Sequence, residues 1–580
     1  MNSFFGETAA KMLMSLLKLD KLNRIYSEIG QTEGMEFLDA LIERFGIRYE
    51  IREEELNRIP AMGPFITVSN HPFGGIDGLI LLKIILQRRP DYKIMGNFLL
   101  QRIEPIKSYI MPVNPFEDFK QASSSFKGLK TGIRQLETKH PLGIFPAGEV
   151  SSFNHDAVGI SDRQWQHSII KFIRKSEVPV VPIYFQGTNS WLFHALGRIH
   201  PILRTIRLPG ELMNKNKKII QVRIGKAISV KDQHEFRESS AYGRFLRAKT
   251  YALGSSLEVK KFFIPAAPRL KREEPVIDPV LVEKLLQEIN SIKDDCLLFK
   301  VSGFHVYCAP SFRIPGILTE LGRLRELTFR EIGEGTNKKI DIDEYDIYYC
   351  QLFLWDAEER KIVGGYRLGK GADILREYGS SGFYIRSLFK IDKKFNPVLK
   401  ESIELGRSFI IKEYQRKSMP LFLLWKGILY FLIKNPEYRY LIGPVSISNR
   451  FSNFSKNVMV GFIKKNYYKA EYAKYVKPRN KFKLAPVTNL DIDILYQITR
   501  DIGKLDQLIS DIETNYRMPV LLKKYLQLNG KIISFNIDPK FNECLDGLIL
   551  LDVYDVPIET IASLSKEIRD ESIIERFCNN

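Results

Sequence analysis

Short apolar runs alternate with helical stretches between residues 65 and 230, and this alternation constrains the fold more than any other feature of the sequence. Apolar runs of about four to eight residues bounded by turn residues predict strands, whereas longer runs predict helices. Strands are predicted over Phe65–Ser69, Lys93–Gly96, Tyr109–Val113, Leu142–Phe145, Val178–Phe185 and Ile219–Ile224. Helices are predicted over Gly78–Gln87, Lys120–Thr138 and Gln164–Lys175. The pattern favours an α/β sheet with covering helices.

A second α/β pattern begins near Leu297, after a stretch rich in proline and charge, Ile264–Ile277, that is typical of a linker. A predicted helix, Pro279–Ile292, lies between them. Further strands are predicted over Tyr348–Trp355, Lys361–Leu368, Glu404–Ile411 and Tyr440–Ser446. Ser418 as N-cap and Pro420 in the first turn predict the start of an apolar helix that runs to Ile433.

The length of 580 residues allows two to four domains, at about 100–200 residues each. We predict two α/β domains joined by a linker. The predicted division is a helical cap at 1–60, a first α/β domain at 61–262, a linker and helix at 263–296, and a second α/β domain at 297–580.

Composition limits the kinds of partner, metal site and membrane segment that this chain can have. The 87 Lys and Arg residues against 68 Asp and Glu residues leave a net charge of +19, which favours an anionic partner. The five cysteines form no C-x-x-C pair, so neither a disulfide framework nor a zinc site is expected.

The longest apolar run, Leu421–Ile433, is interrupted by Lys426 and falls short of the roughly 20 residues that span a bilayer. The N-terminus lacks the basic region of a signal peptide, so we expect a cytoplasmic protein, peripheral on the inner face of the bacterial cytoplasmic membrane.

Two stretches of the sequence are locally rich in Lys and Arg. The first contains Arg198, Arg204, Arg207, Lys215, Lys217, Lys218, Arg223 and Lys226. The second contains Lys456, Lys464, Lys465, Lys469, Lys474, Lys477, Arg479, Lys481 and Lys483, interleaved with tyrosines. Such clusters form either an ordinary solvated surface or a docking surface for anionic lipid or an acidic carrier protein. No nucleic-acid-binding module accompanies them, so nucleic acid is not an expected partner.

The first predicted strand leads directly into a glycine-rich turn that carries a histidine and an aspartate, His71 and Asp77. A histidine at a strand end, before a helix, lies where α/β enzymes place catalytic groups. A nearby aspartate can hold the imidazole in one tautomer, so that it deprotonates a hydroxyl for attack on a thioester. The alternative is a loop histidine beside a helix-capping aspartate.

Two later segments strengthen the case that the His71–Asp77 turn is a catalytic site. The run Phe145–Ser151, FPAGEVS, is another strand that leaves through a glycine turn with an acid and a hydroxyl. The run Val178–Pro182, VPVVP, is a strand with two prolines. In this order the three segments resemble the glycerophosphate/lysophospholipid acyltransferase family, whose marks are N-H-x-x-x-x-D, F-P-E-G-T-R-S and V-P-x-x-P. The spelling is most similar to the haemolysin-like branch and to O-acyltransferases of aminolipid synthesis.

The resemblance implies that His71 and Asp77 are catalytic and that Gly148, Glu149 and Ser151 bind the acyl acceptor. Two departures stand out. Five residues separate His71 from Asp77 where the family has four, an extra residue that Gly74 and Gly75 could absorb because glycine tolerates positive φ. Ala147 also replaces the glutamate that precedes the family's glycine.

The second α/β region carries its own frame of six charged residues and one phenylalanine. They are Arg325, Phe329, Asp343, Asp346, Arg367, Glu404 and Arg407. Taken singly, each charged residue is explained by ion pairs at a solvated sheet edge. Together they resemble the ornithine-lipid N-acyltransferase family, GNAT-fold enzymes related to acyl-homoserine-lactone synthases. The resemblance implies substrate-binding roles for these residues, with Glu404 as the proposed base.

This chemistry needs a neutral amine that attacks a thioester, and a carboxylate can accept its proton. A helix N-terminus can bind the phosphate of phosphopantetheine, and the loop Tyr414–Ser418 is a candidate. The loop lacks the G-x-G of coenzyme A binders, which favours acyl carrier protein over acyl-CoA as donor. No bound cofactor is expected, and no metal-ligand spacing is present.

The sequence therefore predicts a bifunctional acyltransferase of aminolipid synthesis. The C-terminal domain would N-acylate a small amino acid, ornithine or glycine, with a 3-hydroxyacyl chain. The N-terminal domain would then O-acylate the 3-hydroxyl of the lyso-aminolipid. The alternatives are a lysophospholipid or 1-acylglycerol-3-phosphate O-acyltransferase with an accessory GNAT-like domain, and a non-enzymatic, membrane-lytic protein.

Overall fold

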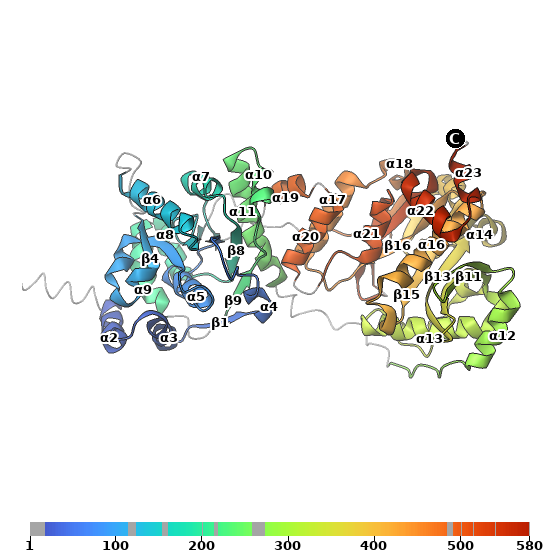
Figure 1. Cartoon of the computed structure of the whole chain (residues 1–580), viewed down its shortest axis with the longest axis horizontal. Coiled ribbons are helices and arrows are strands. Elements are labelled where there is room, and N and C mark those ends of the chain that lie inside the picture. Colours follow the sequence, from blue (N-terminus) through green and yellow to red (C-terminus); the bar gives the residue numbers. More distant parts are fainter. Residues whose placement is uncertain are drawn as a thin grey trace, which may run out of the picture.

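The strands of the chain assemble into two main sheets, one in each half of the molecule (Figure 1). The computed structural model describes residues 18–113, 123–153, 160–199, 201–213, 219–257, 273–483, 491–499, 501–513, 516–539 and 541–578. The two α/β domains lie side by side along the long axis, with the N-terminal domain at the left of Figure 1.

The N-terminal sheet has seven strands in the order β1-β9-β8-β2-β5-β3-β4. They are β1 (Arg48–Ile51), β2 (Ile66–Ser69), β3 (Lys93–Asn97), β4 (Ile110–Val113), β5 (Leu142–Ile144), β8 (Val180–Phe185) and β9 (Ile219–Ile224). All four residues of the central strand β2 are buried, and it runs parallel to both neighbours. Strands buried on both faces appear in the sequence as continuous apolar runs. For this reason the ends of the strands predicted here agree with the observed ends to within two residues.

Helices cover this sheet. They include α5 (Gly75–Leu86), α6 (Ser123–Glu137), α7 (His167–Lys175), α8 (Trp191–Ile199), α9 (Pro201–Leu212) and α11 (Ser239–Ala252). Helix α5 is apolar on nearly every side because it is buried almost throughout. Its first turn follows directly on β2, so the end of β2 and the start of α5 share one short turn.

The predicted helical cap at 1–60 is only partly helical. Helices α2 (Leu19–Ile29) and α3 (Gly34–Arg44) are present, but β1 pairs in parallel with β9 and belongs to the sheet. Residues 1–17 lie outside the described ranges, as do 258–272 of the predicted linker.

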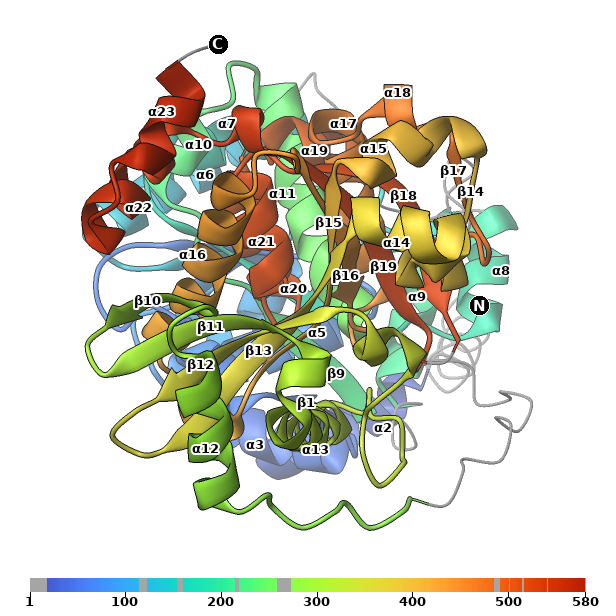
Figure 2. The ribbon, with the colours of Figure 1, turned by 90° about the vertical axis from the view of Figure 1, so that its right-hand side faces the viewer.

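The C-terminal sheet has eight strands in the order β10-β11-β12-β13-β15-β16-β19-β18 (Figure 2). They are β10 (Leu297–Val301), β11 (Phe304–Pro310), β12 (Cys350–Asp356), β13 (Lys361–Lys370), β15 (Ser402–Ile410), β16 (Tyr440–Ile447), β18 (Lys531–Asp538) and β19 (Cys544–Asp552). Within this sheet β15 and β16 pair in parallel, and they pair only from Ser402 to Glu404 with Tyr440 to Ile442. Beyond these three residues the two central strands part.

Helix α16 (Ser418–Lys434) is the crossover that parallel strands require. It begins at Ser418 itself, and the N-cap position is Lys417, which corrects the predicted Ser418 cap. Other helices of this domain are α12 (Val282–Ile292), α13 (Pro315–Glu331), α14 (Gly371–Tyr378), α17 (Asn453–Asn466), α21 (Val520–Gln527) and α22 (Ile558–Ile568).

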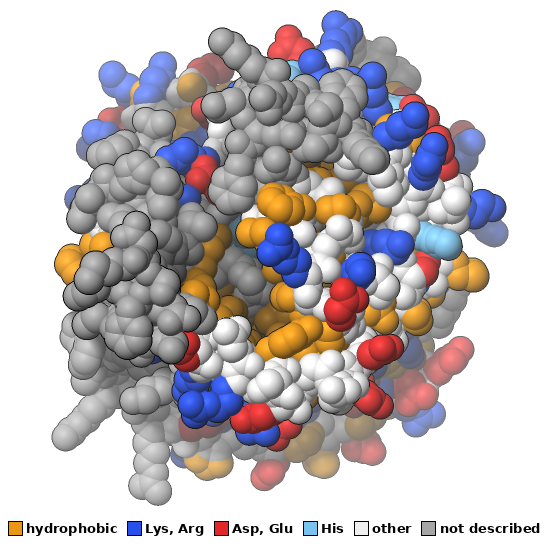
Figure 3. Space-filling view, turned by 90° about the vertical axis from the view of Figure 1, so that its left-hand side faces the viewer, with side chains coloured by type: hydrophobic (Ala, Val, Ile, Leu, Met, Phe, Trp, Pro, Cys, Tyr) orange, Lys and Arg blue, Asp and Glu red, His pale blue; other side chains and the backbone are white. Residues whose placement is uncertain are grey.

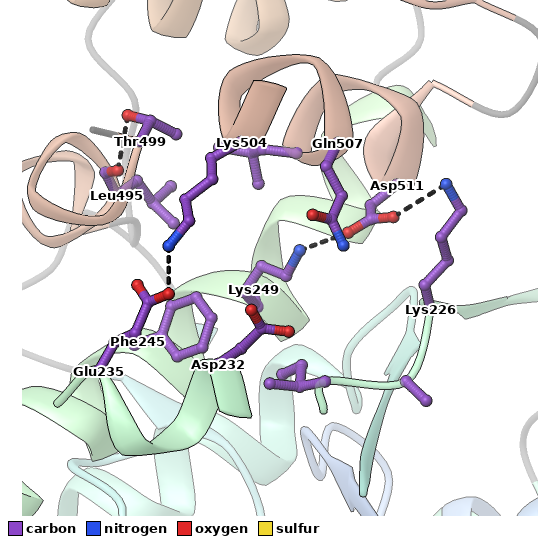
Figure 4. A pocket seen from close by; sticks show the side chains of 13 residues that line it. Lys226, Asp232, Glu235, Phe245, Lys249, Leu495, Thr499, Lys504, Gln507 and Asp511 are labelled. Atoms are coloured by element: carbon purple, nitrogen blue, oxygen red, sulfur yellow. Dashed lines mark hydrogen bonds and ion pairs between the residues drawn. The ribbon is translucent and has the colours of Figure 1, made fainter. Parts of the chain in front are cut away.

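A helical pair from the C-terminal half packs against the N-terminal domain. Helices α19 (Ile492–Ile498) and α20 (Ile502–Ile512) contact α11 and the 3-10 turn Leu253–Leu257. Ion pairs cross this contact, with Lys249 and Lys226 both bound to Asp511 and Lys504 bound to Glu235 (Figure 4). The interface is therefore both apolar and paired in charge.

Candidate active sites

In the N-terminal domain, His71 lies in the turn between β2 and α5. Its Nδ1 is 3.0 Å from Oδ2 of Asp77, in the first turn of α5. The same carboxylate oxygen accepts the backbone N–H groups of Phe73 and Gly74, at 2.9 and 3.0 Å. Burial raises the pKa of Asp77, and the hydrogen bond to His71 acts in the opposite direction. Asp77 therefore holds the imidazole ring from one side, while the ring keeps 18% of its surface exposed.

The extra residue between His71 and Asp77 is taken up at Gly74, which has φ of +87°. A Cβ atom there would lie 3.0 Å from Leu208 and 3.2 Å from Val150, closer than ordinary contacts allow. Glycine at this position both permits the backbone angle and leaves room for its neighbours. The turn thus brings His71 and Asp77 together despite the longer spacing.

The turn after β5 closes over the histidine from the other side. The ring of Phe145 stacks on the imidazole of His71, with 4.1 Å between centroids. The backbone N–H of Ser151 donates to the carbonyl of His71 at 2.8 Å. Gly148 has φ of +70° and packs directly against Gln166. Two segments that are distant in sequence therefore form one local structure.

Asp162 links these two segments, and the sequence does not single it out. Its Oδ1 accepts hydrogen bonds from the Ser151 hydroxyl at 2.5 Å and from the backbone N–H of His71 at 3.1 Å. Its Oδ2 accepts a hydrogen bond from Trp165 Nε1 at 3.2 Å. Burial raises the pKa of this carboxyl group, opposed by the Ser151 hydroxyl. A single aspartate follows no spacing rule, so only the fold identifies it.

Glu149 points toward two arginines. Its carboxylate is 2.7 Å from Arg204 and 3.3 Å from Arg163. Arg204 is buried, as is Arg223, which is 2.8 Å from Glu55. The first basic cluster is therefore not one exposed surface, because at least these two members are interior ion-pair partners. Lys456 of the second cluster is buried as well and donates to Asn449 at 3.0 Å.

In the C-terminal domain, three arginines and three aspartates form a buried ion-pair network. Arg325 donates to Asp346 at 3.0 and 3.1 Å, and Arg367 lies 3.3 Å from the same carboxylate. Asp343 lies 2.5 Å from Arg367 and 3.2 Å from Arg407. Arg407 also lies 3.4 Å from Asp341, a residue outside the predicted site. The structure thus brings together five of the predicted binding residues.

A cavity of about 340 Å³ opens where β15 and β16 part. Its lining includes Leu405, Gly406, Arg407 and Ser408 from β15, Gly443, Pro444, Val445 and Ser446 from β16, and Phe329, Arg367 and Tyr384. The β13–β15 ladder shifts register between Gly365 and Arg367, and Arg407 adopts φ of +52°. This bulge re-aims residues of β15 and places Arg407 at the cavity.

Glu404 does not line the cavity. Its carboxylate accepts the hydroxyl of Tyr349 and the backbone N–H groups of Tyr384 and Ile385, the last two at 3.1 and 2.7 Å. Burial raises its pKa to about 7, and these hydrogen bonds act in the opposite direction. The geometry makes Glu404 an anchor for the 384–385 backbone, and its predicted role as the base stays a prediction. Residues 414–417 are likewise absent from the described lining of the cavity.

Three carboxyl groups line the cavity instead: Glu334, Asp538 and Asp546. Asp546, on β19, accepts the Ser446 hydroxyl at 2.7 Å. Burial raises the pKa of Asp546 to about 7, and nearby Asp538 and Glu334 raise it further. These residues come from three separate segments, so no sequence pattern predicts their meeting.

Two further properties concern the described ranges. No helix there combines the length and apolarity that a bilayer crossing requires. No group of three or more His, Cys, Asp or Glu side chains there is arranged to hold a metal ion.

Comparison with known families matches each half of the chain to a different family. Residues 4–260 match a family described as acyltransferase, and residues 324–425 match the acetyltransferase (GNAT) domain. The GNATL loading domain of CurA from Lyngbya majuscula aligns with 43% of this chain and 98% of its own, at 14% identity and a TM-score of 0.21. At that score the superposition is too weak to bear on this chain.

Two curated relatives come from Bacteroides thetaiotaomicron. Its lyso-glycine lipid O-acyltransferase is 26% identical over 249 residues, which are 42% of this chain and 88% of the relative. Its glycine Nα-acyltransferase is 30% identical over 299 residues, which are 49% of this chain and 87% of the relative. The chain is therefore an acyltransferase that belongs to the family of this glycine Nα-acyltransferase.

Proposed function

We propose that this chain carries out both acylations of a glycine lipid. The C-terminal domain N-acylates glycine with a 3-hydroxyacyl chain, and the N-terminal domain O-acylates the 3-hydroxyl of that product. The activities of the relatives support the pairing, since one is a glycine N-acyltransferase and another a lyso-glycine lipid O-acyltransferase. They also favour glycine over ornithine as the amino acid.

The O-acylation step is assigned to His71 and Asp77. Nε2 of the His71 imidazole accepts the proton of the lyso-lipid hydroxyl. The hydroxyl oxygen then attacks a thioester carbonyl carbon. Asp77, 3.0 Å away, keeps the opposite ring nitrogen protonated and stabilises the imidazolium that forms. Phe145 fixes the plane of the ring.

The N-acylation step is assigned to the cavity between β15 and β16. Strands that part leave backbone N–H and C=O groups unpaired, and the amides of phosphopantetheine can pair with such groups. The observation that carries the assignment is that this cavity is lined both by two arginines, Arg367 and Arg407, and by carboxyl groups. A zwitterionic amino acid needs both.

The donor and the membrane are assigned by charge. The net charge of +19 favours an anionic donor and an anionic lipid surface as the place of work, and the missing G-x-G in the loop Tyr414–Ser418 favours acyl carrier protein over coenzyme A as that donor. Figure 3 shows hydrophobic side chains gathered around a hollow on the outer face of the N-terminal domain, with Lys and Arg beside them. Exposed apolar residues of this domain include Phe98, Leu99, Phe153, Trp191 and Leu192.

The proposal is tested with the purified full-length chain, glycine and 3-hydroxyacyl-acyl carrier protein, with products identified by mass spectrometry. N-acylglycine should form first, and the di-acyl product should appear when a second acyl donor is added. The same assay with a lysophospholipid as acceptor tests the alternative activity. Acylation of lysophospholipid alone, with glycine untouched, would replace the proposed function.

A further inference from the structure

One wall of the C-terminal cavity is a buried carboxyl group that has no cation beside it. Asp546 is 3% exposed and lines the cavity. Its Oδ1 accepts the Ser446 hydroxyl at 2.7 Å and the Cys544 thiol at 3.5 Å. No Lys or Arg of the described chain forms an ion pair with it. Buried charge is costly unless it is paired, so this position suits a cation that arrives from outside.

The side of the cavity formed by β13 and β15, across the gap from β19, carries two guanidinium groups. Arg367 and Arg407 line the same cavity, and the Nε atom of each is buried without a hydrogen-bond partner among the described residues. Arg367 is 1% exposed. Both are held in place by Asp343, so their positions are fixed before any ligand enters.

We propose that Asp546 binds the ammonium group of the α-amino acid and accepts the proton that this group loses, while Arg407 holds the carboxylate of the same substrate. This inference rests on the proposed N-acylation and assigns its acceptor subsite. Substrates with an amine but no neighbouring carboxylate use only half of the subsite and are acylated poorly.

The reaction balances with the groups present. The ammonium group gives one proton to Asp546, and the free amine attacks the thioester carbonyl carbon. A C–N bond forms and the C–S bond breaks, while the nitrogen loses its second proton. The departing thiolate takes up one proton and the other passes to solvent, so the products are the amide, a free thiol and one proton.

Asp546 is better placed for this step than Glu404. Both carboxyl groups have pKa values raised to about 7, mainly by burial, which suits a base at neutral pH. Only Asp546 lines the cavity, whereas Glu404 is occupied by three donors. The other titratable or charged groups that line the cavity are Glu334, Asp538, Cys544, Arg367, Arg407, Tyr366, Tyr384 and Tyr525.

The first test is Asp546→Asn, which keeps the shape and removes the base. N-acylation by the full-length chain should fall by about 10²–10⁴-fold, as for loss of a positioned base. The control is Asp552→Asn, on the same strand, which is buried but paired with Arg439 away from the cavity. That control should keep its N-acylation rate. A loss smaller than tenfold in Asp546→Asn, with the fold intact by circular dichroism, overturns the assignment.

The second test does not depend on that variant folding. In the wild type, the N-acylation rate should rise with pH through about 7, the pKa of Asp546. Ser446→Ala removes a hydrogen bond that lowers this pKa, so the rise should move upward by about 0.5–1 pH unit. Asp538→Asn removes a negative charge that raises it, so the rise should move downward.

Opposite shifts in the two variants support Asp546, because neither residue contacts Glu404. An unshifted profile in both overturns it while leaving the proposed N-acylation in place. A wild-type chain that N-acylates no amino acid overturns the proposed function and the subsite together.

Discussion

Ser151 is linked to His71 in two ways, once directly and once through Asp162. Its backbone N–H donates to the His71 carbonyl at 2.8 Å, and its hydroxyl donates to the Asp162 oxygen that also accepts the His71 N–H. The histidine turn and the glycine turn after β5 are therefore one unit, and Asp162 is its shared anchor.

This relationship predicts a positioning role for Asp162. Asp162→Asn should lower the kcat of O-acylation about tenfold, the scale of one charged hydrogen bond of roughly 1.5 kcal/mol. N-acylation should be unchanged. Because Asp162 acts through His71, the double variant Asp162→Asn/His71→Ala should be no slower than His71→Ala alone. Additive losses would instead indicate a general structural role.

His71→Ala should separate the two activities. O-acylation should fall by about 10²–10⁴-fold, because the hydroxyl loses its base. The N-acylated lyso-lipid should then accumulate, which lipid extracts analysed by mass spectrometry would reveal. A di-acyl product at the wild-type level would remove His71 from the mechanism.

Arg407→Lys should weaken amino-acid binding. Lysine keeps the charge, but it cannot reproduce the fork of donors that a carboxylate accepts. We expect the KM for glycine to rise about 10–100-fold, equivalent to roughly 1.5–3 kcal/mol for a charged hydrogen bond. Steady-state kinetics with glycine varied would measure this, and an unchanged KM would place the carboxylate elsewhere.

Glu404→Gln tests stability rather than chemistry. The pKa of Glu404 is about 7 in the folded chain, against 4.5 for an ordinary glutamate. The folded state therefore binds the proton more tightly, and the stability this contributes is fully present below pH 4.5 and lost as pH rises through 7. The wild type should lose about 3 kcal/mol relative to Glu404→Gln across that range.

Unfolding of both proteins in denaturant at pH 4.5, 6 and 8 would measure the difference. A difference that does not change with pH would mean that Glu404 titrates normally. Near-complete loss of N-acylation in a stably folded Glu404→Gln would restore Glu404 as a candidate base.

Asp511→Asn should loosen the contact between the domains. Asp511 is buried and binds Lys249, whose side chain is only 12% exposed. The variant leaves that ammonium group uncompensated and should cost about 1.5–3 kcal/mol. Calorimetry should then resolve separate transitions for the two domains. The control is Asp491→Asn, whose partner Arg244 is about half exposed, so its loss should cost about 0–1 kcal/mol.

The N-terminal sheet could be predicted apart from β1, because its strands carry strong local patterns, whereas in the C-terminal sheet only β12, β13, β15 and β16, four of eight strands, are predicted. Strands such as β2 and β9 are short apolar runs bounded by turns, and these signals are local in sequence. The sequence does not predict β1, because RYEI is polar at alternate positions and follows two helices, so only its pairing with β9 identifies it as a strand.

The site residues also fall into those that a local sequence pattern predicts and those that only the fold brings together. His71 and Asp77 lie six positions apart and belong to one turn, so their meeting could be predicted. Asp546 meets Ser446 across paired strands 100 residues apart in sequence. The family resemblance offers Glu404 as the base, but a motif match cannot say whether a buried carboxylate faces a cavity or accepts backbone donors, as Glu404 does.

Helices α19 and α20 lie after the linker in sequence but pack against the N-terminal domain, so cutting the chain at the linker would uncover part of that domain. A chain cut in the linker near residue 263 would retain strands β1 to β9 but lose the helices that pack on α11. Lys249 and Lys226 would lose their shared carboxylate at the same cut. The two halves are joined by the linker, yet an N-terminal half cut there would carry an uncovered apolar surface and unbalanced positive charge. Studies of either activity alone are therefore better served by point variants in the intact chain than by truncation.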